Sequence, residues 1–171
     1  AGPVYRTMRV PIGATTTAGE LLDELACTAT PLVIATLEDI EAGVEPTPQS
    51  AEGVTIAPQI HPGDVRIAVT ADAEEIDHLV RGASPAPGAW AKLDDKRFKI
   101  LQTRFVETGD DVPNSVATAQ PGQLVATRKK LFLGTGSQPL ELLQVQAFGK
   151  KAINGTDWAR GAHIDAGTRL R

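Results

Sequence analysis

The residues that could carry acid–base or nucleophilic chemistry are few and widely spaced in this chain. The three histidines are His61, His78 and His163. Each lacks an identifiable carboxylate or nucleophile partner in the sequence, which a catalytic histidine needs. Cys27 is the single cysteine, so the sequence predicts neither an internal disulfide nor a zinc site.

Paired acids and a glycine-rich segment are the next candidates for chemistry. Asp94-Asp95 and Asp110-Asp111 are predicted to lie in hairpin turns, where aspartate favours the backbone geometry. Gly134-Thr135-Gly136-Ser137 is similar to half of a phosphate-binding loop but lacks the lysine and the helix that complete it. We therefore expect a bend between two strands there.

Three basic features remain as candidates for binding. Arg128-Lys129-Lys130 and Lys150-Lys151 are runs of cations, and Arg81 ends a predicted helix. Gly149 precedes the second run, and its lack of a side chain would let both ammonium groups approach a phosphate backbone. Each feature alone could be a solvated group on the surface, but together they favour a nucleic-acid contact surface.

The distribution of charge supports this hypothesis. Residues 1–80 hold 3 Lys and Arg against 13 Asp and Glu, whereas residues 81–171 hold 14 against 8. A change of sign between halves indicates two surfaces with different partners, of which the basic one suits a polyanion. A chance distribution of solvated charges is the alternative.

Composition indicates an ordinary globular protein. The 171 residues are 42% hydrophobic and 22% charged, which is sufficient for a domain with a core. The sequence has no apolar run of membrane-spanning length and no signal-peptide pattern at its start, so we expect a cytoplasmic protein with no membrane partner. The chain does not begin with Met, and we expect its beginning to be cut from a longer protein.

Two helices are predicted near the start of the chain. Thr17 and Glu20 have the spacing of a capping box, and the apolar residues that follow predict a helix over about 18–27. Thr30 is the expected N-cap of a second helix, which Gly43 would end.

A proline-rich stretch divides the sequence. Residues 44–63 hold four prolines with polar residues between them, which is typical of an extended linker. The predicted organisation is a first segment over 1–43, this linker, and a domain over 64–171. Short strands are expected at 9–12 and 54–57.

The domain after the linker is predicted to be mostly strand. An apolar stripe predicts a helix around Ile76, and a short helix is expected after Asn154. Strands are predicted over 89–93, 98–106, 123–127, 131–133 and 140–145. Their spacing is typical of a small antiparallel barrel. The segment from Gly167 onwards is expected to be frayed.

Several short segments in this order and spacing carry a family resemblance. They are TTAGELL (16–22), TL (36–37), PQ (48–49), GVTIA (53–57), VRG (80–82), PAPGAW (85–90), QVQ (144–146), GKK (149–151) and DWARG (157–161). With them, nearly the whole chain resembles the C-terminal half of the bacterial methionyl-tRNA formyltransferases, of an actinobacterial type. The last two segments are the most specific. The chain departs from the family pattern at Ala68-Val69 and at Ala147.

The resemblance implies a fold and a division of labour. It implies an upstream, doubly wound α/β domain that uses 10-formyltetrahydrofolate as co-substrate. The catalytic Asn and His of that domain would lie upstream of Ala1, and its catalytic Asp would immediately precede Ala1. Residues 1–43 would be the last strand and helices of that domain. Residues 64–171 would be an OB-like antiparallel β-barrel, which makes the fold class α+β.

The resemblance also implies partners. The barrel would hold initiator methionyl-tRNA, with Arg81, Lys150 and Lys151 at basic positions that face the tRNA, while Arg128, Lys129 and Lys130 rest on the sequence pattern alone. This chain would contain no catalytic residue and would bind neither folate nor metal, and the full-length enzyme would be monomeric. A non-catalytic RNA-binding module is one alternative. A folate-dependent formyl hydrolase or sugar formyltransferase is another, which Gly149-Lys150-Lys151 disfavours.

Overall fold

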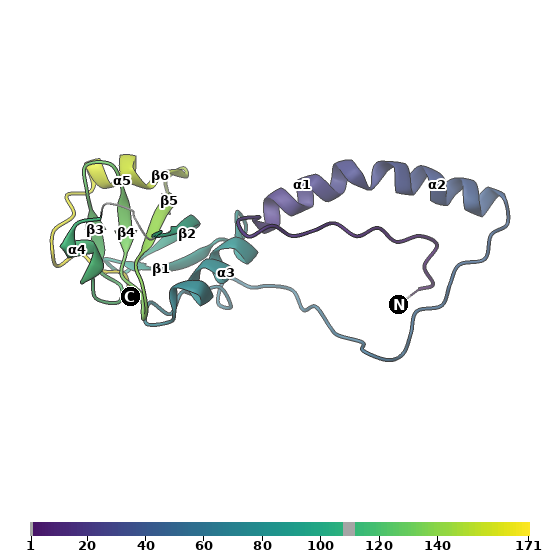
Figure 1. Ribbon diagram of the computed structural model, residues 1–171, viewed down its shortest axis with the longest axis horizontal. Coiled ribbons are helices and arrows are strands. Elements are labelled where there is room, and N and C mark those ends of the chain that lie inside the picture. The colour runs from purple at the N-terminus through teal and green to yellow at the C-terminus, as the bar shows by residue number, and fades with distance from the viewer. Residues whose placement is uncertain (1, 108–111) are drawn as a thin grey trace. The chain divides into compact units, whose positions relative to one another are not determined.

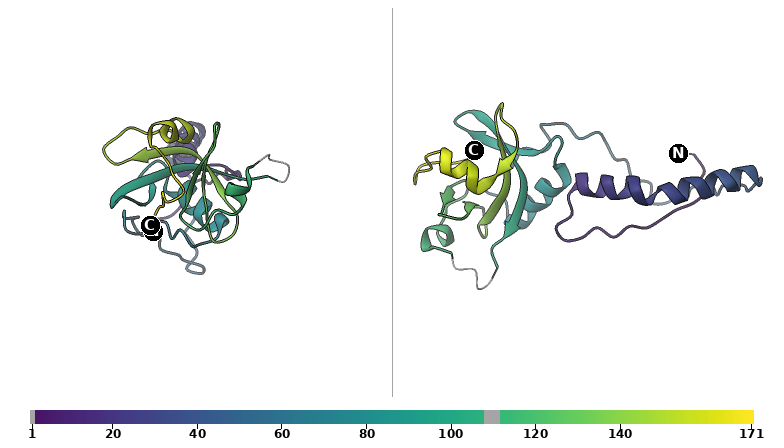
Figure 2. Two further views of the ribbon diagram at one scale, coloured as in Figure 1. Left: turned by 90° about the vertical axis from the view of Figure 1, so that its left-hand side faces the viewer. Right: turned by 90° about the horizontal axis from the view of Figure 1, so that it is seen from above.

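The computed structural model describes residues 2–107 and 112–171. The chain forms two compact units, which are the N-terminal unit, Ala1–Gln59, and the C-terminal unit, Ile60–Arg171 (Figures 1 and 2). The first is made of helices and extended chain, and the second contains the β-sheet.

The N-terminal unit contains two consecutive helices, α1 over Ala18–Thr28 and α2 over Thr30–Glu41. The predicted capping box is confirmed, because the Thr17 hydroxyl accepts from the Glu20 backbone N–H and the Glu20 carboxylate accepts from that of Thr17. The predicted N-cap of α2 is wrong by one residue. Ala29 is the N-cap with helical φ and ψ, and the Thr30 hydroxyl donates to the Ala26 carbonyl at 3.3 Å.

The short strands expected at 9–12 and 54–57 are wrong. The structure shows extended or irregular chain in both segments. Among the described residues of this unit, antiparallel pairing is limited to an isolated bridge between Val4 and Thr47. A strand persists only where a neighbour satisfies its backbone groups, and neither segment has such a neighbour.

The C-terminal unit is built on a curled antiparallel sheet. Its strands are β1 (Ala89–Leu93), β2 (Lys96–Phe105), β3 (Leu124–Ala126), β4 (Leu131–Leu133), β5 (Leu140–Ala147) and β6 (Ile153–Asn154). Their order is β1-β2-β5-β4-β3, and β6 pairs with β5. The five predicted strands are confirmed, β6 was not predicted, and the architecture is compatible with an OB-like fold.

The predicted turn at Asp94-Asp95 is confirmed. These two residues join β1 to β2, with Leu93 opposite Lys96. Both have positive φ, 47° and 61°, as the two central residues of a type I′ hairpin turn require. Their carboxylates therefore belong to a turn rather than to an acid–base pair.

The last residues connect the two edges of the sheet. The Thr168 carbonyl accepts from the Leu124 N–H of β3 at 3.0 Å, and the Leu170 N–H donates to the Gly122 carbonyl beside β3 at 2.8 Å. Arg171 exchanges two more with Lys92 of β1, at 2.7 and 2.8 Å. Leu170 is 1% exposed. The expected fraying is wrong, because residues 168–171 bridge both edges and bury an anchor in the core.

Helices cover the sheet at two places. Helix α3, Ala73–Ala83, buries Ile76 and Val80 and packs against β2 and β1. Helix α5, Gly155–Gly161, is capped by Asn154 and packs against β5 and β4 (Figure 1). The predicted helices at these places are confirmed. A further short helix, α4, spans Asn114–Ala117.

The start of α5 needs glycine because it lies against β5. A Cβ on Gly155 would stand 2.1 Å from the Leu142 carbonyl oxygen. Further along the helix, the Trp158 ring lies 4.5 Å from that of Phe98, which is buried in the core. This close packing fixes α5 beside the segment that leads into it.

Candidate nucleic-acid interface

The turn between β5 and β6 presents the two lysines of the GKK segment. The Lys150 backbone N–H donates to the Ala147 carbonyl at 3.0 Å, and Gly149 has a φ of 70°. A residue at this turn position must have positive φ, which glycine adopts without strain. The Gln146 side-chain amide donates to the Lys150 carbonyl at 2.7 Å and holds the far side of the turn. We call residues 147–151 the basic turn.

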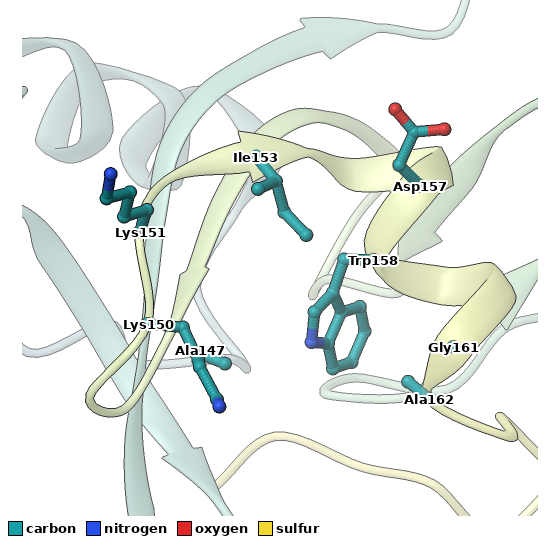
Figure 3. A pocket seen from close by; sticks show the side chains of 8 residues that line it. All are labelled: Ala147, Lys150, Lys151, Ile153, Asp157, Trp158, Gly161 and Ala162. Carbon is teal, nitrogen blue, oxygen red and sulfur yellow. The ribbon is translucent and has the colours of Figure 1, made fainter.

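A cavity of about 470 Å³ lies between the basic turn and α5 (Figure 3). The Trp158 ring forms one wall, Ile153 and Ala147 lie nearby, and both lysines line it. The Asp157 carboxylate points away from Trp158 in Figure 3 and binds Arg160 at 2.8 Å. The cavity is therefore apolar inside and basic at its rim.

Both lysines of the basic turn are exposed. Within residues 2–107 and 112–171, no carboxylate is paired with either one, so both ammonium groups are available to an external anion. Figure 3 shows the two ammonium groups pointing in different directions. They would therefore contact different phosphates of a polyanion rather than clamp a single one.

The second basic run lies in the connection from β3 to β4. Arg128 and Lys129 are exposed, and the Thr127 hydroxyl accepts from the Lys129 and Lys130 backbone N–H groups at 3.4 and 3.0 Å. The Thr156 hydroxyl donates to the Lys129 carbonyl at 2.9 Å. This bond connects residues 128–130 to the first turn of α5. That turn follows the basic turn and β6 in the sequence.

Lys130 differs from its neighbours because it faces a buried carboxylate. Glu141 of β5 is 7% exposed and accepts from Arg104 at 2.6 Å. The Lys130 ammonium lies 3.4 Å from the same carboxylate oxygen. Since a buried carboxylate needs neutralising partners, Lys130 has a structural task in the sheet.

Arg81 is held in the same manner on α3. Its guanidinium Nε donates to the Asp77 carboxylate at 2.8 Å, and the Thr103 hydroxyl donates to the other oxygen at 2.6 Å. Asp77 is buried and Arg81 half-buried. The spacing of Asp77 and Arg81, four residues apart on one helix, already indicates such a pair.

Three side chains in or beside the basic turn were missed by sequence reasoning; Phe148 and Arg97 are exposed and Lys99 is half-buried. Arg97 and Lys99 of β2, with Phe148 of the turn, line a second hollow of about 240 Å³. Phe98 and Ile100 between and beyond them are buried. This alternation of basic and apolar residues over 97–100 is the signal that could have found the two cations.

In the part of the chain that the structure describes, the three histidines lie on the surface. His61 and His163 are exposed, and His78 is exposed with its Nε2 3.9 Å from Glu74. Asp110-Asp111 lies outside the described residues. The expected bend at residues 134–137 is confirmed, and its Ser137 hydroxyl accepts from the Ala73 N–H at the start of α3.

The part of the chain that the structure describes contains neither a candidate metal site nor a helix that could span a membrane. No group of three His, Cys, Asp or Glu there could hold a metal ion. Of the described helices, none is long and apolar enough to cross a membrane.

Solved structures share the fold of the chain at low sequence identity. A multiply substituted variant of HypX from Aquifex aeolicus matches with a TM-score of 0.73 at 20% identity, over 96% of this chain and 29% of that one. HypX in complex with tetrahydrofolic acid matches with a TM-score of 0.59 at 20% identity, over 80% of this chain and 23% of that one.

Curated relatives are much more similar in sequence. The methionyl-tRNA formyltransferase of Cutibacterium acnes is 82% identical over 171 residues, which are 100% of this chain and 54% of that protein. The enzyme of the same name from Streptomyces coelicolor is 44% identical, over 99% of this chain and 53% of that protein. The chain thus spans about half the length of these relatives, and the resemblance to their C-terminal half is confirmed.

A family model described as "Formyl transferase, C-terminal domain" matches residues 59–163. This match covers most of the chain, including the basic turn and α5. The chain therefore belongs to the formyl transferase family, whose C-terminal domain residues 59–163 represent.

Proposed function

We propose that this chain is the tRNA-positioning part of a methionyl-tRNA formyltransferase. The whole enzyme would transfer a formyl group from 10-formyltetrahydrofolate to the amino group of methionyl initiator tRNA. The observation that carries the proposal is that Lys150 and Lys151 are exposed on a hydrogen-bonded turn, with no carboxylate partner among the described residues. The chain that holds them is 82% identical to a methionyl-tRNA formyltransferase. Cations that a fold holds in place without partners suit phosphate contacts.

The proposed tRNA-facing surface extends beyond the basic turn. Arg128 and Lys129 are exposed and joined to α5 through Thr156, so they extend it in one direction. Arg81 and Lys130 stay predictions for this surface. We expect smaller contributions from them because each already neutralises a buried carboxylate.

The finer description of the fold is also a proposal. We infer that the sheet of the C-terminal unit is an OB-like barrel, since residues 168–171 hydrogen-bond to both of its edges. We infer that residues 1–43 belong to the catalytic domain of the whole enzyme, with 44–63 as a linker. The exposed apolar residues of α1 and α2 support this, because they have the character of a surface that packs on another one.

We infer that the cavity beside α5 is not a folate site. The cavity beside α5 is walled by Trp158, Ile153 and small residues. It lacks a buried polar side chain among the described residues that line it, whereas a polar pterin ring needs such groups to fix its orientation. We therefore propose no chemical step for the residues of this chain. Its contribution would be to hold the tRNA so that the aminoacyl end reaches the reacting centre in an attack geometry.

The test is binding of the 171-residue chain to initiator tRNA over a series of salt concentrations, beside a double-stranded DNA. We expect binding that prefers tRNA and weakens with salt, because phosphate contacts release counterions. Replacing both lysines (Lys150→Ala and Lys151→Ala) should lower the slope of log affinity against log salt by roughly one to two.

A matched loss of two charges elsewhere controls for net charge. Arg6 and Arg9 are exposed in the N-terminal unit, and replacing both (Arg6→Ala and Arg9→Ala) should leave the salt slope unchanged. Equal binding of tRNA and DNA, or a double lysine variant with the wild-type slope, would contradict the proposal.

A further inference from the structure

Phe148 stands at the tip of the basic turn with 67% of its surface exposed. The backbone on both sides of it is fixed, by the Lys150 N–H on the Ala147 carbonyl and by the Gln146 side chain on the Lys150 carbonyl. Because the backbone that carries the ring is already fixed, little backbone entropy is lost when a partner covers the ring.

Cations of β2 share the face that carries this ring. Lys99 lies opposite Gln146 and Phe98 opposite Ala147 in the register of β2 and β5. Because side chains alternate along a strand and Phe98 is buried, Arg97 and Lys99 point to the other face, beside Phe148. The Arg97 guanidinium lies 4.6 Å from the centre of the Trp90 ring, a cation–π contact that orients it.

The chemistry of this hollow selects a partner that is both flat and anionic. An apolar ring alone would suit many surfaces, but Arg97 and Lys99 line the hollow beside this one, and the exposed Lys150 and Lys151 follow it in the same turn. A nucleotide offers an aromatic face and a phosphate within one residue. Stacking of bases on exposed aromatic rings in basic grooves is a general mode of single-strand recognition.

We propose that Phe148 stacks on an unpaired base of the bound RNA, while Arg97 and Lys99 contact the phosphates next to that base. The base must be unpaired because neighbours cover both faces of each base inside a helix. This inference rests on the proposed function and specifies one contact within it.

The test compares Phe148→Ala with the unchanged 171-residue chain in binding to an initiator tRNA transcript. We expect affinity to fall about 10-fold, as the loss of one stacked base implies. The salt slope should stay unchanged, since no cation is removed. Phe148→Trp should keep affinity within about 3-fold, because it preserves the stacking surface.

Two controls make this effect specific. Ile56 is exposed in the N-terminal unit, and Ile56→Ala should bind the transcript like the unchanged chain. A single-stranded oligoribonucleotide should lose affinity for Phe148→Ala as the transcript does, whereas an RNA duplex closed at both ends by loops of non-nucleotide linker should not.

The outcomes separate this inference from the proposed function. If the unchanged chain shows no preference for tRNA, the proposed function fails. If it binds tRNA and the double lysine variant lowers the slope, but Phe148→Ala binds equally well, only the stacking contact fails. An equal loss on the closed duplex would also overturn the stacking contact. A changed sedimentation coefficient for Phe148→Ala without loss of RNA affinity would instead indicate that protein covers the ring.

Discussion

The two units of the chain contain similar helices but bury them very differently. In the C-terminal unit, α3 places five residues of its eleven in the buried interior. In the N-terminal unit, neither α1 nor α2 has a buried residue, and Leu37 is 61% exposed. A capping box defines where α1 begins, whereas packing against a sheet stabilises α3. Helices of 11 or 12 residues are marginal without such packing.

The two units of the chain therefore differ in what stabilises them. The C-terminal unit has its own core, which can hold the basic turn in place. The N-terminal unit exposes apolar helix faces that suit packing against another surface. We propose that the rest of the catalytic domain provides that surface. Changes in the two units should therefore have effects of different size and kind.

A core substitution tests the comparison most strongly. Phe98 is 1% exposed and packs against Trp158, so Phe98→Ala should lower the free energy of unfolding by about 4 kcal/mol. Leu37→Ala in α2 should change it by less than about 0.5 kcal/mol, because that side chain is already exposed. Urea denaturation followed by circular dichroism measures both. A comparable loss for Leu37→Ala would show that the N-terminal unit has a core of its own.

The buried ion pair of α3 should give the next largest effect. Arg81→Ala leaves the buried Asp77 with the Thr103 hydroxyl alone, and should cost about 3 kcal/mol of unfolding free energy. Lys151→Ala removes the same charge from an exposed turn and should cost almost nothing. Thermal unfolding of both variants measures this contrast. Equal melting temperatures would mean that Arg81 is as free to bind RNA as Lys151.

Acid should produce the smallest effect, confined to the local bonds of the N-terminal unit. The Thr17 backbone N–H lowers the pKa of Glu20, and the Arg6 guanidinium lowers the pKa of Asp39. A carboxyl with a lowered folded-state pKa adds stability that is complete above its unfolded value, here 4.5 and 3.8, and is lost as pH falls through the folded value. The start of α1 and the bond from Arg6 to Asp39 should therefore loosen only below about pH 4.

Nuclear magnetic resonance can follow this titration. The Thr17 amide and the Arg6 Nε–H should shift with midpoints below 4.5 and 3.8 respectively. Thr17→Ala offers a matched variant, because it removes the side-chain half of the capping box and should allow Glu20 to titrate closer to its ordinary value. Midpoints at the ordinary values in the unchanged chain would show that these bonds do not form in solution.

Sequence reasoning succeeded where the signal was local. The apolar stretch of β1, the Asp94-Asp95 turn and the capping box of α1 each depend on residues close together in the chain. The strands predicted at residues 9–12 and 54–57 were wrong because β-propensity depends on the surroundings of a strand, and these segments have no strand beside them.

The site follows the same rule. The exposure of Lys150 and Lys151 followed from their place after a turn glycine, so the basic turn was predictable. The pairing of Lys130 with Glu141 was not, because those residues lie on different strands. Leu170 was missed for a related reason, since the strand edge that it joins lies more than forty residues earlier.

The bridge formed by residues 168–171 also sets the time during translation at which the sheet of the C-terminal unit can be completed. Lys92 of β1 emerges from the ribosome about 80 residues before Arg171, to which it hydrogen-bonds. At roughly 5–20 residues per second, the Lys92 end of this edge of β1 waits several seconds for its partner, while Trp90 on the same edge can already bond to Val65 and Ile67. During that interval an open edge can pair with another nascent chain. A newly made sheet is thus most exposed to misassembly just before residues 168–171 arrive.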